Sequence, residues 1–320
     1  MLTIDVWYGC ERSFGRQGIP QDAINILGNV RPARYVAELF YTLDGDFPVK
    51  LSLGPDRRRL SRPGDFNVEI VTEGLSEGTH TLRLEAVDVS GGIAISEVIF
   101  HYGGERRRSP ELEIDWRDVA RIDDAAQVID GLWGLADGCV RTLAPGYDRV
   151  IGVGDIAWSD YEVTVPVTIH GFDIKGVNPI GYGYNVGIVL RWQGHADWDG
   201  RQPRYGYYPY GALALYEYNF GRDPHHFHLR LYGNNVQPLN EQQCVIRLEL
   251  GVPYIFKAFV RSCPNETAHY GIKVWQSDQT EPANWALEGR GFIGERTEGA
   301  VLLLAHHTDA SFGNVKIRPC

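Results

Sequence analysis

The feature that most constrains this sequence is a long run in which apolar and polar side chains alternate. Residues 158–170 read WSDYEVTVPVTIH. Successive side chains of a β-strand point to opposite faces, so every second residue from Tyr161 to Ile169 would share one apolar face, and Glu162 and His170 would share the other. A helix would scatter the same apolar residues around its surface. The run therefore predicts a strand in a sheet that is buried on one face.

Shorter runs of the same kind recur along the whole chain. They come at a spacing of roughly ten residues and are separated by turn residues such as the Asp44-Gly45 pair. The chain has 37 Gly, 17 Tyr, 12 Phe and 8 Trp against one Met, a composition that suits short strands joined by tight turns. We therefore predict an all-β protein.

One polar segment divides the strand-rich sequence into two parts. Residues 104–111, GERRRSPE, contain Gly and Pro and carry few apolar side chains. A chain of 320 residues has room for two domains of ordinary size. We predict a first β-sandwich over residues 1–103, a linker over residues 104–111 and a second β-sandwich over residues 112–320.

The first part contains a motif with a family resemblance. Residues 75–92 read LSEGTHTLRLEAVDVSGG, and Leu82, Leu84 and Ala86 share one face of the strand in this run. The pattern L-x-x-G-x-H-T-L-x-L-x-A-x-D-x-x-G resembles bacterial immunoglobulin-like or cadherin-like modules. The resemblance covers about residues 1–103 and implies a seven-stranded sandwich that serves as a spacer or interaction module.

The second part resembles a different group of sandwiches. The segments WSDYEVTVPV, GIVLRW, LELGVPYIFKAFV and ASFGNVKI occur in this order. They resemble the concanavalin A-like lectin and glucanase superfamily, which includes laminin-G-like jelly rolls, over about residues 112–320. The expected fold class is therefore all-β, an N-terminal immunoglobulin-like sandwich followed by a concanavalin A-like jelly-roll sandwich. That superfamily includes lectins, hydrolases, lyases and adhesion modules, so the resemblance leaves the activity open.

Charge and hydropathy exclude several classes of partner. The formal net charge of −10 disfavours binding to nucleic acid or to an anionic membrane surface. No run of about 18 apolar residues occurs, so no membrane span is expected. The first residues lack a basic stretch followed by an apolar one, so they do not form a signal peptide. We expect a cytoplasmic protein, or a secreted one whose leader has been removed.

Residues 184–232 hold the candidate binding site. Three strand-like runs in this stretch carry charged side chains on one face, and a loop rich in Tyr joins the first two. Aromatic rings cover the apolar faces of sugars, and charged or amide groups bind sugar hydroxyls. We therefore expect a concave face that binds a polysaccharide or glycan. The expected binding residues are Arg191, Trp192, Tyr208, Tyr210, Arg230, Tyr232 and Lys257.

An enzyme that uses the same groove is the alternative, with Glu217 and His228 in acid and base roles. Glycoside hydrolysis normally needs two carboxylates roughly 5 to 9 Å apart. The E-x-D-x-x-E strand of hydrolases in the resembled superfamily is absent here, so the second carboxylate would come from a loop residue such as Asp197, Asp199 or Asp223. A His base would instead suit a polysaccharide lyase. A structural or adhesion protein without a sugar site is the third possibility.

Few residues suggest a metal ion or a cofactor. Asp197 and Asp199, in the loop sequence DWDG, are spaced to offer oxygen ligands to Ca²⁺, although the later Glu of an EF-hand loop is missing. No other cofactor is expected, because the sequence contains no Gly-rich phosphate loop between a strand and a helix. The five Cys form no CxxC pair, and only Cys244 and Cys263 lie on strands that we expect to be neighbours.

Overall fold

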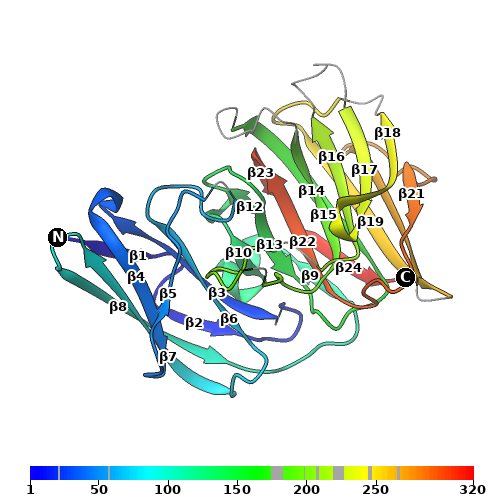
Figure 1. The fold of residues 1–320 in the computed structure, drawn as a ribbon. Coiled ribbons are helices and arrows are strands. Elements are labelled where there is room, and N and C mark those ends of the chain that lie inside the picture. Colours follow the sequence, from blue (N-terminus) through cyan, green and yellow to red (C-terminus); the bar gives the residue numbers. More distant parts are fainter. Residues whose placement is uncertain are drawn as a thin grey trace.

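The computed structural model confirms the all-β prediction. It describes residues 1–20, 22–56, 58–173, 183–197, 199–206, 209–218, 227–243, 247–264 and 267–320. Within these ranges the chain forms strands and four 3-10 helices of three residues each, at Ala33–Tyr35, Trp116–Asp118, Ile122–Asp124 and Asn234–Val236. Figure 1 shows two lobes, the first in blue and cyan and the second from green to red. Among the described residues, no helix is long and apolar enough to cross a membrane.

The N-terminal lobe packs a three-stranded sheet against a five-stranded sheet. The first sheet has the order β1 (Thr3–Val6), β3 (Ala23–Arg31), β6 (Asp65–Val71). The second has the order β2 (Glu11–Phe14), β8 (Ile93–Tyr102), β7 (Gly78–Asp88), β4 (Val36–Leu43), β5 (Val49–Lys50). Leu82, Leu84 and Ala86 of β7 are fully buried between the sheets, as their alternation predicts. The immunoglobulin-like assignment stays a prediction.

The C-terminal lobe is a larger sandwich of two sheets. The seven-stranded sheet has the order β10 (Gln127–Asp130), β13 (Arg149–Val153), β22 (Ala300–His306), β15 (Tyr184–Trp192), β16 (Ala212–Tyr218), β17 (Phe227–Gly233), β18 (Gln237–Gln243). The other sheet has the order β11 (Trp133–Ala136), β12 (Cys139–Thr142), β23 (Thr308–Phe312), β14 (Tyr161–Phe172), β19 (Pro253–Cys263), β20 (Thr267–Gln276), β21 (Leu287–Arg290). Two further strands extend it: β24 (Val315–Pro319) pairs with β14, and β9 (Leu112–Ile114) pairs with β24.

The main core lies between these two sheets. The alternating run of β14 confirms the prediction, because its apolar side chains from Tyr161 to Ile169 are at most 2% exposed, and Glu162 and His170 face outward. β15 and β22 are different, since every described side chain along them is buried. Their second face carries another apolar cluster, which includes Val189 and Leu302. The seven-stranded sheet is therefore covered on part of its outer face as well.

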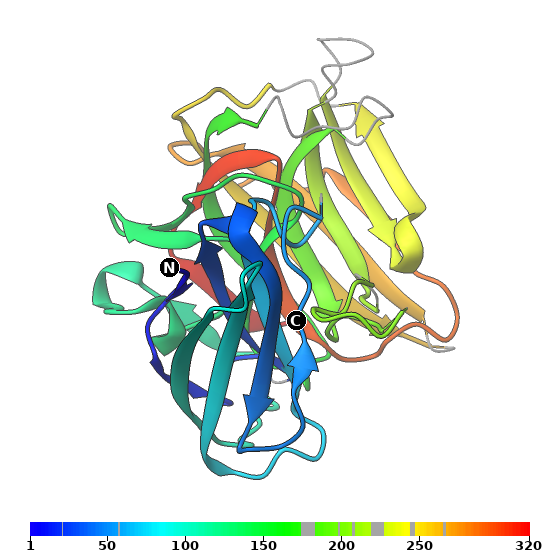
Figure 2. The same ribbon diagram turned by 60° about the vertical axis from the view of Figure 1, so that its left-hand side comes forward.

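The N-terminal lobe and the loop between β15 and β16 cover that outer face. Ser52 of the first lobe donates a backbone hydrogen bond to the carbonyl of Gln202 in this loop. Figure 2 shows the loop in yellow-green at the base of the face, beside the blue strands. The segment predicted as a linker, residues 104–111, runs along the second lobe, where Arg107 bonds to Asp155 and Trp158.

A buried polar interface joins the two lobes. Arg59 of the first lobe donates from Nε to both carboxylate oxygens of Asp130 on β10, at 2.8 and 3.0 Å, and pairs through Nη1 with Glu69 on β6. Asn67 of β6 donates to Asp130 at 3.0 Å, and Gln127 of β10 reaches back to the carbonyl of residue 23. Both carboxylates and the guanidinium are almost fully buried. The first lobe is thus fixed against the second by charge and hydrogen bonds.

Candidate functional site

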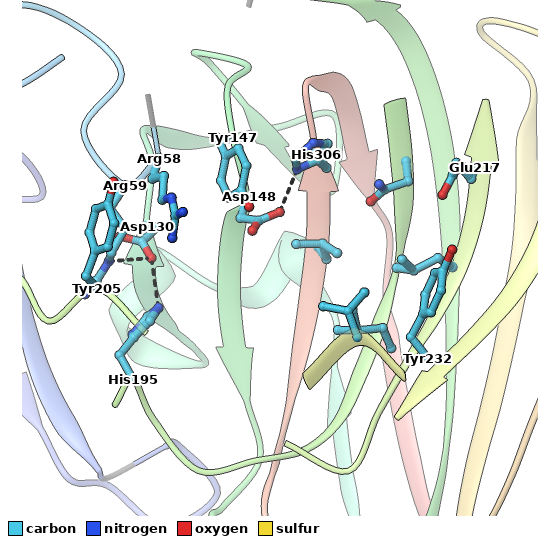
Figure 3. A pocket seen from close by; sticks show the side chains of 15 residues that line it. Arg58, Arg59, Asp130, Tyr147, Asp148, His195, Tyr205, Glu217, Tyr232 and His306 are labelled. Atoms are coloured by element: carbon cyan, nitrogen blue, oxygen red, sulfur yellow. Dashed lines mark hydrogen bonds and ion pairs between the residues drawn. The ribbon is translucent and has the colours of Figure 1, made fainter. Parts of the chain in front are cut away.

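A pocket of about 280 Å³ opens on the outer face of the seven-stranded sheet, where the N-terminal lobe meets it (Figure 3). Strands β15, β16, β17 and β22 form its floor and one side, and the first lobe and the loop after β15 form the other side. The lining side chains are Arg58, Arg59, Asp130, Tyr147, Asp148, Asn185, His195, Tyr205, Leu213, Leu215, Glu217, Tyr232, Val236, Leu304 and His306.

Four polar side chains lie in one row across neighbouring strands of the sheet. His306 of β22 is opposite Asn185 of β15, Asn185 is opposite Glu217 of β16, and Glu217 is opposite His228 of β17. Residues directly opposite each other in an antiparallel pair point to the same face. The row therefore presents an imidazole, an amide, a carboxyl group and a second imidazole in steps of roughly 5 Å.

The next row along the strands is apolar. Leu304 of β22 and Leu215 of β16 are both opposite Gly187 of β15, and Leu213 lies two residues further along β16. These three leucines line the pocket. Since Gly187 has no side chain, the floor between Leu304 and Leu215 is low. A bound molecule would meet an apolar floor on one side and a row of hydrogen-bonding groups on the other.

Asn185 offers an unused hydrogen-bonding atom to the pocket. The residue is 8% exposed, and its Oδ1 atom accepts no hydrogen bond from any residue that the structure describes. A buried carbonyl oxygen without a donor costs free energy of about 1–3 kcal/mol, so such atoms are normally satisfied by water or by a ligand. The position of Asn185 between His306 and Glu217 makes it the central polar contact of the row.

Glu217 is the carboxyl group of the row and is mostly buried. Burial raises its pKa, and the nearby Arg230 and His306 offset only part of this effect. The Nε atom of Arg230 lies 3.7 Å from Glu217, and its Nη1 atom lies 3.3 Å from Glu241 and bonds to the Tyr232 hydroxyl. A carboxyl group in this setting can accept hydrogen bonds when ionised and can donate a proton when protonated.

His306 is oriented by a carboxylate. Its Nδ1 atom lies 2.7 Å from Asp148, and the ring of Tyr147 meets its ring edge-on at 4.7 Å between centroids. With Nδ1 held by Asp148, the other ring nitrogen is left to act as donor or acceptor toward a ligand. Figure 3 shows Asp148 and His306 in the middle of the pocket, with Glu217 and Tyr232 on one side and Arg58 and Tyr205 on the other.

The structure brings together only some of the predicted binding residues. Glu217, His228, Arg230 and Tyr232 share one face of the sheet, as expected, and Glu217 and Tyr232 line the pocket. Tyr208 lies outside the described residues. Tyr210 is fully buried, where its hydroxyl accepts a hydrogen bond from the Val236 amide, so it presents no open ring face.

The prediction that Arg191 faces the groove is wrong. A β-bulge between Val189 and Trp192 shifts the register, and Arg191 has a positive φ of 53°. A bulge redirects the side chains that follow it. Arg191 therefore turns to the end of the sandwich, where it bonds to Asp160 and Ser262. Trp192 does lie on the outer side, but it is buried within the second apolar cluster.

The prediction that Lys257 shares this face is also wrong. Lys257 lies on β19, which belongs to the other sheet between β14 and β20. Its ammonium group lies 2.9 Å from Glu162 and 3.2 Å from Glu281 on the far side of the sandwich. The period of two indicates that Lys257 points outward from its strand. It does not indicate to which of the two sheets that strand belongs.

The predicted calcium ligands Asp197 and Asp199 are engaged within their own turn. Asp197 accepts hydrogen bonds from the backbone amides of Asp199 and Gly200, and Asp199 pairs with Arg201 at 2.8 Å. These contacts form an acidic turn at the surface. Among the described parts of the chain, no group of three or more His, Cys, Asp or Glu side chains is placed to hold a metal ion.

Four residues that line the pocket are not predicted from the sequence, namely Arg58, Asp148, Asn185 and His306. Two of them follow the same period of two that was applied elsewhere, because His306 is in phase with Leu302 and Leu304, and Asn185 is in phase with Gly187. Arg58 and Asp148 lie in loops, and only the tertiary fold places them at the pocket.

Comparisons with known proteins give weak similarity. No protein-family model and no curated protein matches the chain. The exoplasmic/lumenal domain of VIP36 in its Ca²⁺/Man2-bound form matches with 12% identity and a TM-score of 0.41, covering 67% of this chain and 86% of that one. An endo-β-1,4-glucuronan lyase from the fungus Trichoderma reesei matches with 8% identity and a TM-score of 0.38, covering 66% and 96%.

A third match covers a smaller part of both chains. An endo-β-1,4-mannanase from Thermotoga petrophila matches with 12% identity and a TM-score of 0.24, and the match covers 33% of this chain and 20% of the mannanase. At these TM-scores the concanavalin A-like assignment stays a prediction.

Proposed function

We propose that this protein binds a carbohydrate chain in the pocket on the outer face of the seven-stranded sheet. The observation that carries the proposal is the row of His306, Asn185 and Glu217 beside a floor of leucines. A pyranose ring has apolar CH faces and an edge of hydroxyl groups. Such a ring placed on Leu215 and Leu304 would turn its hydroxyls toward the row.

The polar groups of the row suit hydroxyls, which both donate and accept. The Oδ1 atom of Asn185, which accepts no hydrogen bond from the described residues, and an ionised Glu217 can accept hydrogen bonds. The ring nitrogen of His306 that does not contact Asp148 can donate or accept. Tyr147, Tyr205 and Tyr232 add aromatic surface around the floor, where rings can pack against sugar CH groups. The proposal agrees with the expected jelly-roll class, in which lectins are one of several functions.

Removing the central amide should weaken sugar binding. We expect Asn185→Ala to reduce the affinity for the best oligosaccharide about tenfold, because one hydrogen bond and part of the row are lost. Calorimetric titration with a panel of oligosaccharides would measure this. Lys257→Ala is the matched control, since Lys257 lies on the other sheet. The affinity of this variant for the same oligosaccharide should stay within about twofold of the wild-type value.

The pH dependence of binding should report the state of Glu217. Burial raises the pKa of this carboxyl group above its ordinary value of about 4.3. If the ionised form accepts sugar hydroxyls, the affinity is constant at neutral pH and falls as the pH drops through that raised pKa. Three other titratable or charged residues act on the Glu217 carboxyl group, namely Arg230, Glu241 and His306. Glu217→Gln should remove this loss of affinity at low pH. If the loss is unchanged in the variant, the titration belongs to another residue.

Catalysis in the same pocket is the second candidate function. The favouring observation is that Glu217, with its raised pKa, and the His306–Asp148 pair lie in one pocket on either side of Asn185. These are groups of the kinds used for general acid and base catalysis. A polysaccharide panel, assayed for new reducing ends and for unsaturated products, tests it. Glu217→Gln should then abolish product formation and leave binding measurable, whereas product formation that persists would remove Glu217 from the chemistry.

A further inference from the structure

We propose that the bound glycan is anionic and that Arg58, supplied by the N-terminal lobe, pairs with its carboxylate or sulfate group. The inference rests on the proposed function, because it names the class of sugar chain that the same pocket would take. It also gives the N-terminal lobe a direct part in the binding site, which is more specific than the spacer or interaction role that its sequence resemblance implies.

The charge balance of the pocket carries this proposal. Arg59 pairs with Glu69 and Asp130, and the Nδ1 atom of His306 lies 2.7 Å from Asp148. The Arg58 guanidinium has neither a carboxylate within ion-pair distance nor a hydrogen-bond acceptor among the described residues. The guanidinium lies over the ring of Tyr205, whose centroid is 4.4 Å from its central carbon. A cation that lines a pocket and has no protein counter-ion is a ready site for an anion.

The surrounding structure fixes the backbone from which Arg58 projects. Its amide donates to the Asp56 carboxylate at 2.8 Å, and its carbonyl accepts from the buried Arg149 at 2.6 Å. The next residue, Arg59, is locked in the ion cluster between the lobes. With the backbone held and the guanidinium resting on an aromatic ring, less conformational entropy is lost when an anion binds.

The acidic residues of the pocket set the direction of the glycan. Glu217 lies on the side opposite Arg58, and Asp148 lies between them (Figure 3). A ligand carboxylate beside Glu217 would be repelled, whereas Asp130 at the other side is neutralised by Arg59. The anionic group should therefore lie at the Arg58 side, with neutral hydroxyls toward Glu217. Because the protein as a whole carries a net charge of −10, attraction of a polyanion has to be local.

The test compares acidic with neutral oligosaccharides on the full chain. Titrations would use oligomers of glucuronate, mannuronate and galacturonate, a sulfated galactan oligomer, and neutral glucan and mannan oligomers. We expect tighter binding of an acidic oligomer than of the neutral ones, and a loss of about tenfold for that oligomer in Arg58→Gln. The uronate and sulfated arms show which anionic group is used. Arg58→Lys should retain only part of the affinity, because an ammonium cannot form the paired hydrogen bonds of a guanidinium.

Arg201→Gln is the matched control. Arg201 also approaches the Tyr205 ring, at 5.6 Å, but it pairs with Asp199 and does not line the pocket. An equal loss in both variants would overturn the proposal by showing a general surface effect. Equal affinity for neutral and acidic oligomers, with no change in Arg58→Gln, would also overturn it and leave the proposed function standing. Failure of every oligosaccharide to bind would overturn both. Thermal unfolding of each variant checks that the fold is kept.

Discussion

Replacing Arg59 by Met should lower the free energy of unfolding by about 3–5 kcal/mol. The substitution keeps most of the side-chain volume but leaves Asp130 and Glu69 without their shared cation. The two carboxylates are at most 2% exposed, so water cannot replace the guanidinium. Equilibrium denaturation by urea, followed by Trp fluorescence and by circular dichroism, would measure the loss.

The size of this effect follows from the position of the cluster. Burial alone would raise the pKa of Glu69, but Arg59, His195 and Arg204 together lower it, so the carboxylate is ionised in the folded protein. Removing the central cation therefore leaves buried negative charge. Since Arg59 and Glu69 belong to the first lobe and Asp130 to the second, the same change loosens the contact between lobes, and the two spectroscopic signals should no longer report one transition.

An exposed ion pair supplies the control for this prediction. Arg31 lies 2.5 Å from Asp5, and both side chains are more than two-fifths exposed. Arg31→Met should therefore cost about 1 kcal/mol or less. A second check is Arg59→Met combined with Asp130→Asn, which should be less destabilising than the sum of the two single changes because it also removes one unpaired charge. If Arg59→Met is as mild as Arg31→Met, the cluster does not hold the lobes together.

The period of two was enough to predict the fold class because it marks strands with one buried face. β14 and β7 show this plainly, and in both the predicted inward residues are buried. The same signal is missing where a strand is buried on both faces. β22 is apolar throughout and then ends in His306, so its pattern marks the face that carries the pocket only at this last residue.

The candidate site was harder to predict, for two physical reasons. A bulge changes the side-chain phase by one residue, which the sequence pattern of β15 does not reveal, and Arg191 was assigned to the wrong face as a result. The site also draws on distant parts of the chain. Arg58 reaches the pocket only because the first lobe docks on the second through contacts between residues far apart in sequence.

Arg191 should prove to be a stabilising residue and not a binding residue. Its guanidinium is 1% exposed and donates four hydrogen bonds, to the carbonyls of Ser159 and Arg296 and to the side chains of Asp160 and Ser262. Arg191→Ala removes these four hydrogen bonds and opens a cavity where the buried side chain lay. We expect a loss of about 3 kcal/mol in the free energy of unfolding, measured by urea denaturation.

Binding by this variant separates the two roles of the side chain. Below its unfolding transition, Arg191→Ala should bind the best oligosaccharide within about twofold of the wild-type affinity, because the bulge turns residue 191 away from the pocket. Arg230→Ala is the contrast, since Arg230 shares the face of Glu217 and bonds to Tyr232, and it should lose affinity with a smaller change in stability. If the Arg191→Ala protein were fully stable but did not bind sugar, Arg191 would be a binding residue in the groove. That result would contradict the bulged geometry of β15.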